Sequence, residues 1–135
     1  MAATAKNTAK DTTKENSTKK IGDQAEALAI GYLQQRGLQV MGRNFHCRGG
    51  EIDLICRDGR MLVFIEVRLR QQQGFGGAAA SITRRKQQRI ILAARHYLAS
   101  QAGADQFDCR FDCILLDALD PQRIEWLQAA FSADA

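Results

Sequence analysis

The sequence lacks the apolar stretches that mark a membrane protein or a secreted one. No apolar run approaches the ~20 residues that a membrane-spanning helix needs. The first ten residues, MAATAKNTAK, contain no apolar segment that could serve as a secretory signal. We therefore expect a cytoplasmic protein with no membrane partner. Its 135 residues, 45% hydrophobic and 25% charged, suit one modest domain.

Cysteine is scarce, and its spacing does not favour a zinc site. Cys47, Cys56, Cys109 and Cys113 include no CxxC pair, although His46 beside Cys47 keeps a zinc site open as an alternative. In a cytoplasmic protein we expect reduced thiols rather than disulfides. Cys109 and Cys113 fall on one side of an expected strand, so we interpret the thiols as small hydrophobic side chains.

Lysine is nearly absent from the main part of the chain, and charge is unevenly distributed. Residues 1–20 carry five lysines against two acidic residues and almost nothing to bury, so we expect a disordered basic tail before a single domain over residues 21–135. That domain holds thirteen arginines and one lysine, Lys86. Residues 36–95 have a net charge of +8, and residues 96–135 have −5. A basic region around a few carboxylates suits a polyanion, although a solvated surface without a partner has the same composition.

The spacing of apolar residues predicts helices and strands in alternation, with Ala25, Ala29 and Leu33 on the inner face of a first helix and Ile90, Ala93 and Ala94 on that of a second. A helix is expected over residues 23–36, where Asp23 can cap its start and Gly37 can end it in a left-handed conformation. Further elements are a short extended segment at 38–40, strands at 51–57, 61–68, 110–116 and 124–127, a glycine-containing loop at 71–80 and a helix at 81–99. This order predicts an α/β domain with a mixed sheet between helices.

The most informative pattern is the hairpin over residues 51–68. If Asp58-Gly59 is its two-residue turn, Asp53 faces Phe64 and Glu51 faces Glu66. Partners across a ladder, and alternate residues along a strand, project to the same side. One face then carries Glu51, Asp53, Glu66 and Arg68, and the other carries Ile52, Leu54, Val63, Ile65 and Val67.

On that register Asp53 and Glu66 are diagonal neighbours, with Cβ atoms roughly 7–8 Å apart. Two carboxylates at such a separation can share a small cation, and Mg²⁺ suits an open site of this kind because it keeps several waters. The alternative is a salt-bridged sheet edge. There Glu66 would pair with Arg68 or Arg70, and Asp53 with Arg57 or Arg43.

These residues also carry a resemblance to a known family. GGEIDLI (49–55), LVFIEVRLR (62–70), the Phe75-Gly76-x-Ala78 loop, Lys86 and the series Ala93, Tyr97 and Leu98 resemble the YraN-like family of predicted bacterial endonucleases. The earlier series Glu26, Ala29, Tyr32, Leu33 and Gly37, and Asn44, fit it too, so the likeness covers about residues 22–131. That family is similar to restriction-endonuclease-like and Holliday-junction-resolvase nucleases, whose signature is a D…ExK arrangement on a hairpin beside a helix.

The resemblance implies a restriction-endonuclease-like three-layer α/β/α fold and metal-dependent hydrolysis of DNA phosphodiester bonds. Asp53 and Glu66, with the carbonyl of Val67, would hold Mg²⁺ or Mn²⁺, and Glu26 would add a further acidic group. Arg84, Arg85, Lys86 and Arg89 would hold the nucleic-acid backbone near a helix N-terminus. We expect DNA, branched and single-stranded DNA included, as the partner, and a homodimer is one candidate assembly.

One position departs from the family pattern. Arg68 occupies the place of the ExK lysine, and an arginine does not lose its proton, so it cannot act as a general base. The chain could therefore be a nucleic-acid-binding module that has lost cleavage, or Lys86 could reach the site from another direction. A protein-interaction domain that uses the acidic C-terminal section is a third alternative. Glu26 also has a competing interpretation, because Asp23-x-x-Glu26 resembles a helix capping box.

Overall fold

The computed structural model describes residues 2–69 and 82–133. Its elements in chain order are α1 (Ala2–Gln35), β1 (Gln39–Cys47), β2 (Gly50–Asp58), β3 (Met61–Leu69), α2 (Arg84–Ser100), the short 3-10 helix η2 (Ala104–Gln106), β4 (Asp108–Leu116) and β5 (Ile124–Phe131). The loop expected at 71–80 lies outside the described residues. No helix among the described residues is both long and apolar enough to span a membrane.

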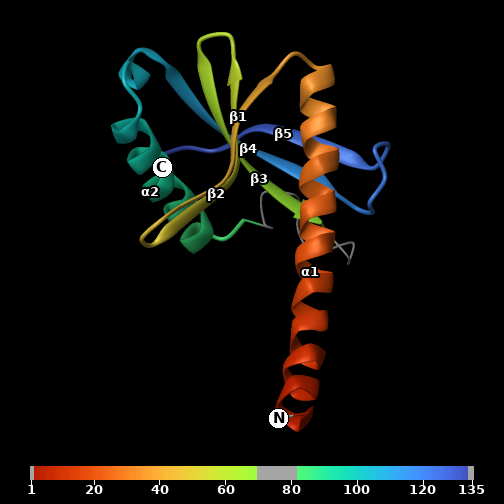
Figure 1. Cartoon of the computed structure of the whole chain (residues 1–135). Helices are drawn as coiled ribbons and strands as arrows, with labels where there is room; N and C mark the ends of the chain where they lie inside the picture. Colours follow the sequence, from red (N-terminus) through yellow and green to blue (C-terminus); the bar gives the residue numbers. More distant parts are fainter. Residues whose placement is uncertain (1, 70–81, 134–135) are drawn as a thin grey trace.

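The five strands form one mixed sheet in the order β1-β2-β3-β4-β5. All neighbours are antiparallel except β3 and β4, which are parallel and are joined through α2. Figure 1 shows α1 and α2 on opposite sides of this sheet. The prediction of a three-layer α/β/α fold with a mixed sheet is therefore confirmed, and the arrangement is compatible with a restriction-endonuclease-like fold.

Each helix covers its own hydrophobic cluster. On one face, α1 places Ala25, Ala29 and Leu33 against the buried side chains of Leu54, Cys56, Val63, Ile65, Ile114 and Leu116. On the other, α2 places Ile90, Ala93 and Ala94 against Ile55, Leu62, Phe64 and Phe111. The helical spacing of the apolar residues had predicted both inner faces. Because the sheet is covered on both sides, a charged side chain in the middle of β3, such as Glu66, is buried.

Helix α1 is longer than the predicted helix at 23–36. It continues from Ala2, and its N-terminal part extends beyond the sheet (Figure 1). Asp23 therefore lies inside the helix, and its predicted role as an N-cap is wrong. Gly37 adopts φ +89°, and Leu38 N donates to Leu33 O, which confirms the predicted left-handed end of the helix. A helix without packing partners is marginal in water, so disorder over residues 1–20 stays a prediction.

The register of the β2–β3 hairpin differs from the prediction. Ile55 faces Phe64 and Asp58 faces Met61, so the turn is Gly59-Arg60 and not Asp58-Gly59. Gly59 has φ +61°, and Asp58 stays in the ladder because its φ is not positive. The pairing moves by two residues, which preserves the side to which the paired residues point. Continued by one step, this register would bring Asp53 opposite Glu66 instead of diagonal to it.

The two outer strands extend further than their sequence pattern indicates. β1 runs to Cys47, well beyond the predicted segment at 38–40, and β5 runs to Phe131 instead of 127. A register shift interrupts each strand, and Asn44 and Ala129 adopt φ values of +50° and +51°. Such irregularities break the alternation of apolar and polar residues on which strand prediction rests.

Candidate metal and phosphate site

Asp53 and Glu66 meet where the β2–β3 ladder ends. The last backbone pair of that ladder is Leu54 with Ile65. One step further, the Val67 backbone N–H donates to Asp53 Oδ2 at 2.9 Å, so a carboxylate takes the place of a backbone acceptor. Glu66 is only 6% exposed, and Asp53 is half-buried. The two carboxylates lie side by side, as the sequence predicted: besides burial, the charge of Asp53 and a side-chain hydrogen bond with it both raise the pKa of Glu66.

The strand is irregular at Asp53, which overturns one part of the predicted face. Ile52 was expected on the face of Leu54, but Ile52 packs with Ile55 in the cluster under α2. Strict alternation would place Ile52 and Ile55 on opposite faces. Asn44, which lies opposite Asp53 on β1, has a left-handed backbone conformation. Both strands are thus distorted where the acidic pair forms.

The environment of Glu66 opposes its ionisation. Burial, followed by the charge of Asp53, raises the pKa of Glu66 to about 8, while Lys86 and Arg68 act in the opposite direction. A carboxyl group that must lose its proton in a buried place beside a second carboxylate does so at a cost. A cation between the two groups would remove that cost.

Glu26 brings a third acidic side chain toward this pair from α1. Burial, and then Asp53, raise the pKa of Glu26. Arg43 Nη2 lies 3.6 Å from Glu26 Oε1, yet this buried oxygen accepts no hydrogen bond within the described residues. The capping-box interpretation of Glu26 is wrong, because Asp23 is not at a helix start. Glu26 instead faces β1 and the acidic pair on β2 and β3.

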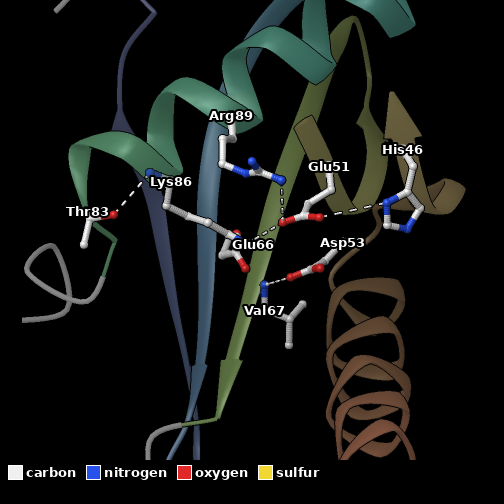
Figure 2. A network of polar contacts seen from close by, with 8 residues as sticks. All are labelled: His46, Glu51, Asp53, Glu66, Val67, Thr83, Lys86 and Arg89. Atoms are coloured by element: carbon white, nitrogen blue, oxygen red, sulfur yellow. Dashed lines mark hydrogen bonds and ion pairs between the residues drawn. The ribbon is translucent and has the colours of Figure 1, made fainter. Parts of the chain in front are cut away.

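Lys86 approaches the acidic pair from the opposite side, on α2. Its Nζ lies 3.1 Å from Glu51 Oε1 and 3.7 Å from Glu66 Oε2 (Figure 2). Burial lowers the pKa of Lys86, but Glu66 and Glu51 outweigh it, and the net pKa is raised. The sequence hypothesis that Lys86 reaches the site from another direction is correct in its geometry.

Basic side chains surround Glu51 at this end of the site. Besides Lys86, Arg89 Nη2 lies 3.7 Å from Oε1 and His46 Nδ1 lies 3.9 Å from Oε2 (Figure 2). The hydrogen bond from Lys86 lowers the pKa of Glu51 most strongly, although burial opposes it. Glu51 therefore carries its negative charge at neutral pH and holds the cations of α2 against β2.

Two local features position Lys86 beside Glu51 and Glu66. Thr83 caps α2 by accepting a hydrogen bond from Lys86 N at 3.1 Å, which fixes the first turn of the helix. Gly50 lets the helix approach β2 closely. A Cβ atom at position 50 would lie 2.3 Å from Arg89 O and 3.1 Å from Ala93 N. The glycine thus permits direct contact between the strand and the helix backbone.

The other predicted basic residues divide into two groups. Arg89 contacts Glu51, whereas Arg84 and Arg85 are exposed and face solvent. Arg68 is half-buried, and its Nε atom has no hydrogen-bond partner in the part of the chain that is described. Among the described residues Glu66 has an ion pair with Lys86 and none with Arg68, so the predicted alternative of an Arg68–Glu66 pair is not formed. The other predicted partner, Arg70, lies outside the described residues.

Comparison with known proteins places the chain in a family. The model of the uncharacterised protein family UPF0102 matches residues 25–116, which include every acidic residue of the site and Lys86. The chain belongs to the UPF0102 family. A UPF0102 protein of Dechloromonas aromatica is 53% identical over 113 residues, which are 84% of this chain and 89% of that protein. One of Cupriavidus taiwanensis is 55% identical over 125 residues, 91% of each chain. One of Legionella pneumophila strain Corby is 49% identical over 116 residues, 86% of this chain and 98% of that protein.

The YraN-like resemblance is thereby confirmed at the level of the family. The names of these UPF0102 relatives state no activity, so the endonuclease interpretation remains a proposal. The four cysteines of this family member are thiols and not disulfides, with Cys56 and Cys113 buried. His46 lies toward Glu51 rather than joining Cys47 in a metal site.

The acidic pair in this UPF0102 chain fits a hard divalent cation by its donor set. All donors are carboxylate oxygens, and a buried oxygen of Glu26 nearby has no hydrogen-bond partner among the described residues. Across residues 2–69 and 82–133, no three His, Cys, Asp or Glu side chains gather closely enough to enclose a metal. Mg²⁺ is commonly bound through one or two carboxylates together with waters and substrate phosphates, so a two-carboxylate site is sufficient for it.

Glu51 was not among the residues chosen from the sequence. Its place on the polar face of the hairpin was predicted, but its role depends on how α2 lies over β2. The Gly49-Gly50 pair directly before Glu51 was the available signal, because a glycine in a strand often marks a close backbone approach.

Proposed function

We propose that the chain is a metal-dependent endonuclease that hydrolyses DNA phosphodiester bonds. The observation that carries this proposal is the buried Glu66 beside Asp53, with the Lys86 ammonium 3.7 Å from Glu66 on its other side. Two adjacent carboxylates attract a divalent cation, and a positive charge beside them favours a phosphate anion. We also propose a cytoplasmic location, with DNA as the partner and a homodimer as a candidate assembly.

Hydrolysis requires a water oxygen to form a bond to phosphorus while one phosphorus–oxygen ester bond breaks. The electron pair of the broken bond stays on the leaving oxygen, which takes up a proton, and the proton displaced from the water passes to solvent. A divalent cation, when bound, would polarise the phosphoryl oxygen and lower the pKa of the attacking water. Asp53 and Glu66 would hold that Mg²⁺ or Mn²⁺.

The chain itself supplies orientation and charge. The Val67 N–H fixes one oxygen of Asp53, which leaves the second oxygen for a cation. Arg84 and Arg85 lie exposed at the start of α2, where they can bind phosphates that flank the site. Glu26 stands behind the pair on α1 and adds negative charge.

The test uses purified protein with branched, single-stranded and duplex DNA, with Mg²⁺ or Mn²⁺ and with EDTA. We expect cleavage that needs the metal, and Asp53→Asn or Glu66→Gln should slow it at least about a hundredfold. Asp105→Asn, which removes an exposed carboxylate on η2, is the matched control and should cleave normally. Absence of cleavage by wild-type protein and by Arg68→Lys with every substrate would refute the endonuclease proposal.

A second candidate function is a nucleic-acid-binding module that no longer cleaves. Arg68 favours it, because an arginine at the ExK position cannot act as a base. This function predicts salt-dependent binding that weakens when exposed Arg84 and Arg85 are replaced by serine. If Arg84 and Arg85 only form a solvated surface, replacing them by serine will leave nucleic-acid binding unchanged. That result would count against both the endonuclease and the binding module.

A further inference from the structure

We propose that Lys86, held in place by Glu51, provides the positive charge that faces the reacting phosphate. In the ExK pattern this positive charge comes from the residue at position 68, whereas here it would come from Lys86 on α2. This inference rests on the proposed endonuclease function for its role in cleavage. Its geometry and its effect on metal binding can be tested separately.

The first argument is the location of the ammonium group. Lys86 Nζ lies 3.7 Å from Glu66 Oε2, so it borders directly on the carboxylate that would hold the cation. Its side chain is 27% exposed, which leaves part of it accessible to a ligand. It is also the one lysine in residues 21–135, a region that holds thirteen arginines. A phosphate that reaches a cation on Glu66 would therefore meet this ammonium.

The second argument is the contrast with Arg68. Its Nε atom is buried and lacks a hydrogen-bond partner within the described ranges, so the guanidinium is not held against Glu66 as Lys86 is. A guanidinium is larger than an ammonium and is most effective where it can bind two oxygens side by side. Within the described residues, Lys86 supplies the compact charge that forms an ion pair with the carboxylate of Glu66.

The third argument is the way in which Glu51 holds Lys86. An ammonium has three donor hydrogens, and one is used at 3.1 Å by Glu51 Oε1. The other two remain for Glu66 and for a phosphate oxygen. Arg89 also contacts Glu51, so Lys86 does not have to balance that carboxylate alone. Glu51 is therefore a positioning residue, and Lys86 is the group that would touch the substrate.

The role requires the charge of Lys86 and its position, not the loss of its proton. The carboxylates around it keep the ammonium charged. It would neutralise charge that builds up on the phosphate and hold the phosphate in line with the attacking water.

The cleavage experiment compares kcat and KM for wild type, Lys86→Met, Glu51→Gln, the double variant of these two, and Lys86→Met combined with Arg68→Lys. We expect Lys86→Met to lower kcat by about a hundredfold with a smaller change in KM. Glu51→Gln should lower kcat by about tenfold and add nothing to Lys86→Met, because it acts through Lys86. A lysine at position 68 should recover part of the activity of Lys86→Met.

Arg95→Met is the matched control, since it removes an exposed positive charge from the same helix away from the site. Circular dichroism and the melting temperature of each variant separate misfolding from a catalytic effect, and Lys86→Gln is a second neutral variant if Lys86→Met fails to fold. Unchanged kcat in folded Lys86→Met or Lys86→Gln would overturn the inference. Additive losses for Glu51→Gln and Lys86→Met would overturn the part assigned to Glu51.

Metal binding without DNA supplies an independent readout. Removing a positive charge 3.7 Å from Glu66 should strengthen Mn²⁺ binding by about tenfold in Lys86→Met, measured by calorimetry at pH 7.5, and leave it unchanged in Arg95→Met. Equal Mn²⁺ affinity in wild type and Lys86→Met would overturn the inference. If no variant cleaves DNA but Lys86→Met binds Mn²⁺ more tightly, the proposed function fails while the placement of Lys86 stands.

Discussion

Replacing Glu66 by glutamine should stabilise the metal-free protein above neutral pH. In the unfolded chain Glu66 loses its proton near pH 4.5, whereas in the folded protein burial and Asp53 delay this loss to about pH 8. Between these values folding takes up a proton, so the free energy of unfolding falls as the pH rises from about 4.5 to about 8. Glutamine has nearly the same shape and no such proton, so this part of the pH dependence should disappear.

The magnitude follows from the size of the pKa shift. A shift from 4.5 to about 8 corresponds to at most roughly 5 kcal/mol. Water can reach the edge of the site and relax the charged form, so we expect about 2–3 kcal/mol in the protein. For a domain of this length that equals a rise in melting temperature of roughly 5–15 °C. At pH 5 wild-type Glu66 is still protonated when folded, and the two proteins should be equally stable.

Urea unfolding in EDTA at pH values from 5 to 9 measures this difference. Asp105→Asn, which removes an exposed carboxylate, serves as the control and should run parallel to wild type. Adding Mg²⁺ should restore stability to wild type at pH 8.5 but not to Glu66→Gln. If Glu66→Gln is the less stable protein at pH 8.5, or if the two curves stay parallel, then Glu66 is not electrostatically strained and the reasoning about the acidic pair fails.

Three further predictions concern packing and thiol reactivity. Asp112 is fully buried and accepts hydrogen bonds from Arg110, the Trp126 indole and the Ala129 backbone, so Asp112→Ala should lower the urea-unfolding free energy by about 3–5 kcal/mol. Gly50→Ala should lower it by about 2–3 kcal/mol, because the new Cβ would clash with the backbone of α2. Burial raises the pKa of Cys56 to about 12, so a thiol reagent at pH 8 should modify exposed Cys109 before Cys56, which peptide mass spectrometry can check.

Local patterns predicted the layers and the polar face of the hairpin. The spacing of Ala25, Ala29 and Leu33 identified the face of α1 that packs on the sheet. The predicted register was displaced by two residues, but an even displacement leaves the paired residues 54–58 and 61–65 on their predicted sides. Ile52, which lies beyond the paired residues, is the exception. The prediction that Asp53 and Glu66 lie close together was therefore correct although the turn was wrongly assigned. It requires only that both residues point to the same side of the hairpin and lie near the end of the ladder.

Features that depend on contacts between distant segments were not available from local patterns. Ile52 packs under α2 where the Asp53 side chain accepts a hydrogen bond from Val67 N and where Asn44 on the neighbouring strand has a left-handed conformation. The approach of Lys86 depends on how closely α2 lies over Gly50, which the amphipathic pattern of the helix does not specify. The sequence could name Lys86 as a candidate, but the distance to Glu66 required the fold.

The hydrogen bond from the Val67 amide to Asp53 makes one rung of the sheet depend on a side chain that would also serve as a ligand. A cation held by the other oxygen of Asp53 would keep this carboxylate, and with it the Val67 N–H, in place. Occupancy of the site would then be readable as slower hydrogen exchange at a single amide. The open end of the hairpin would tighten, while exchange at the paired residues near Gly59 would stay the same.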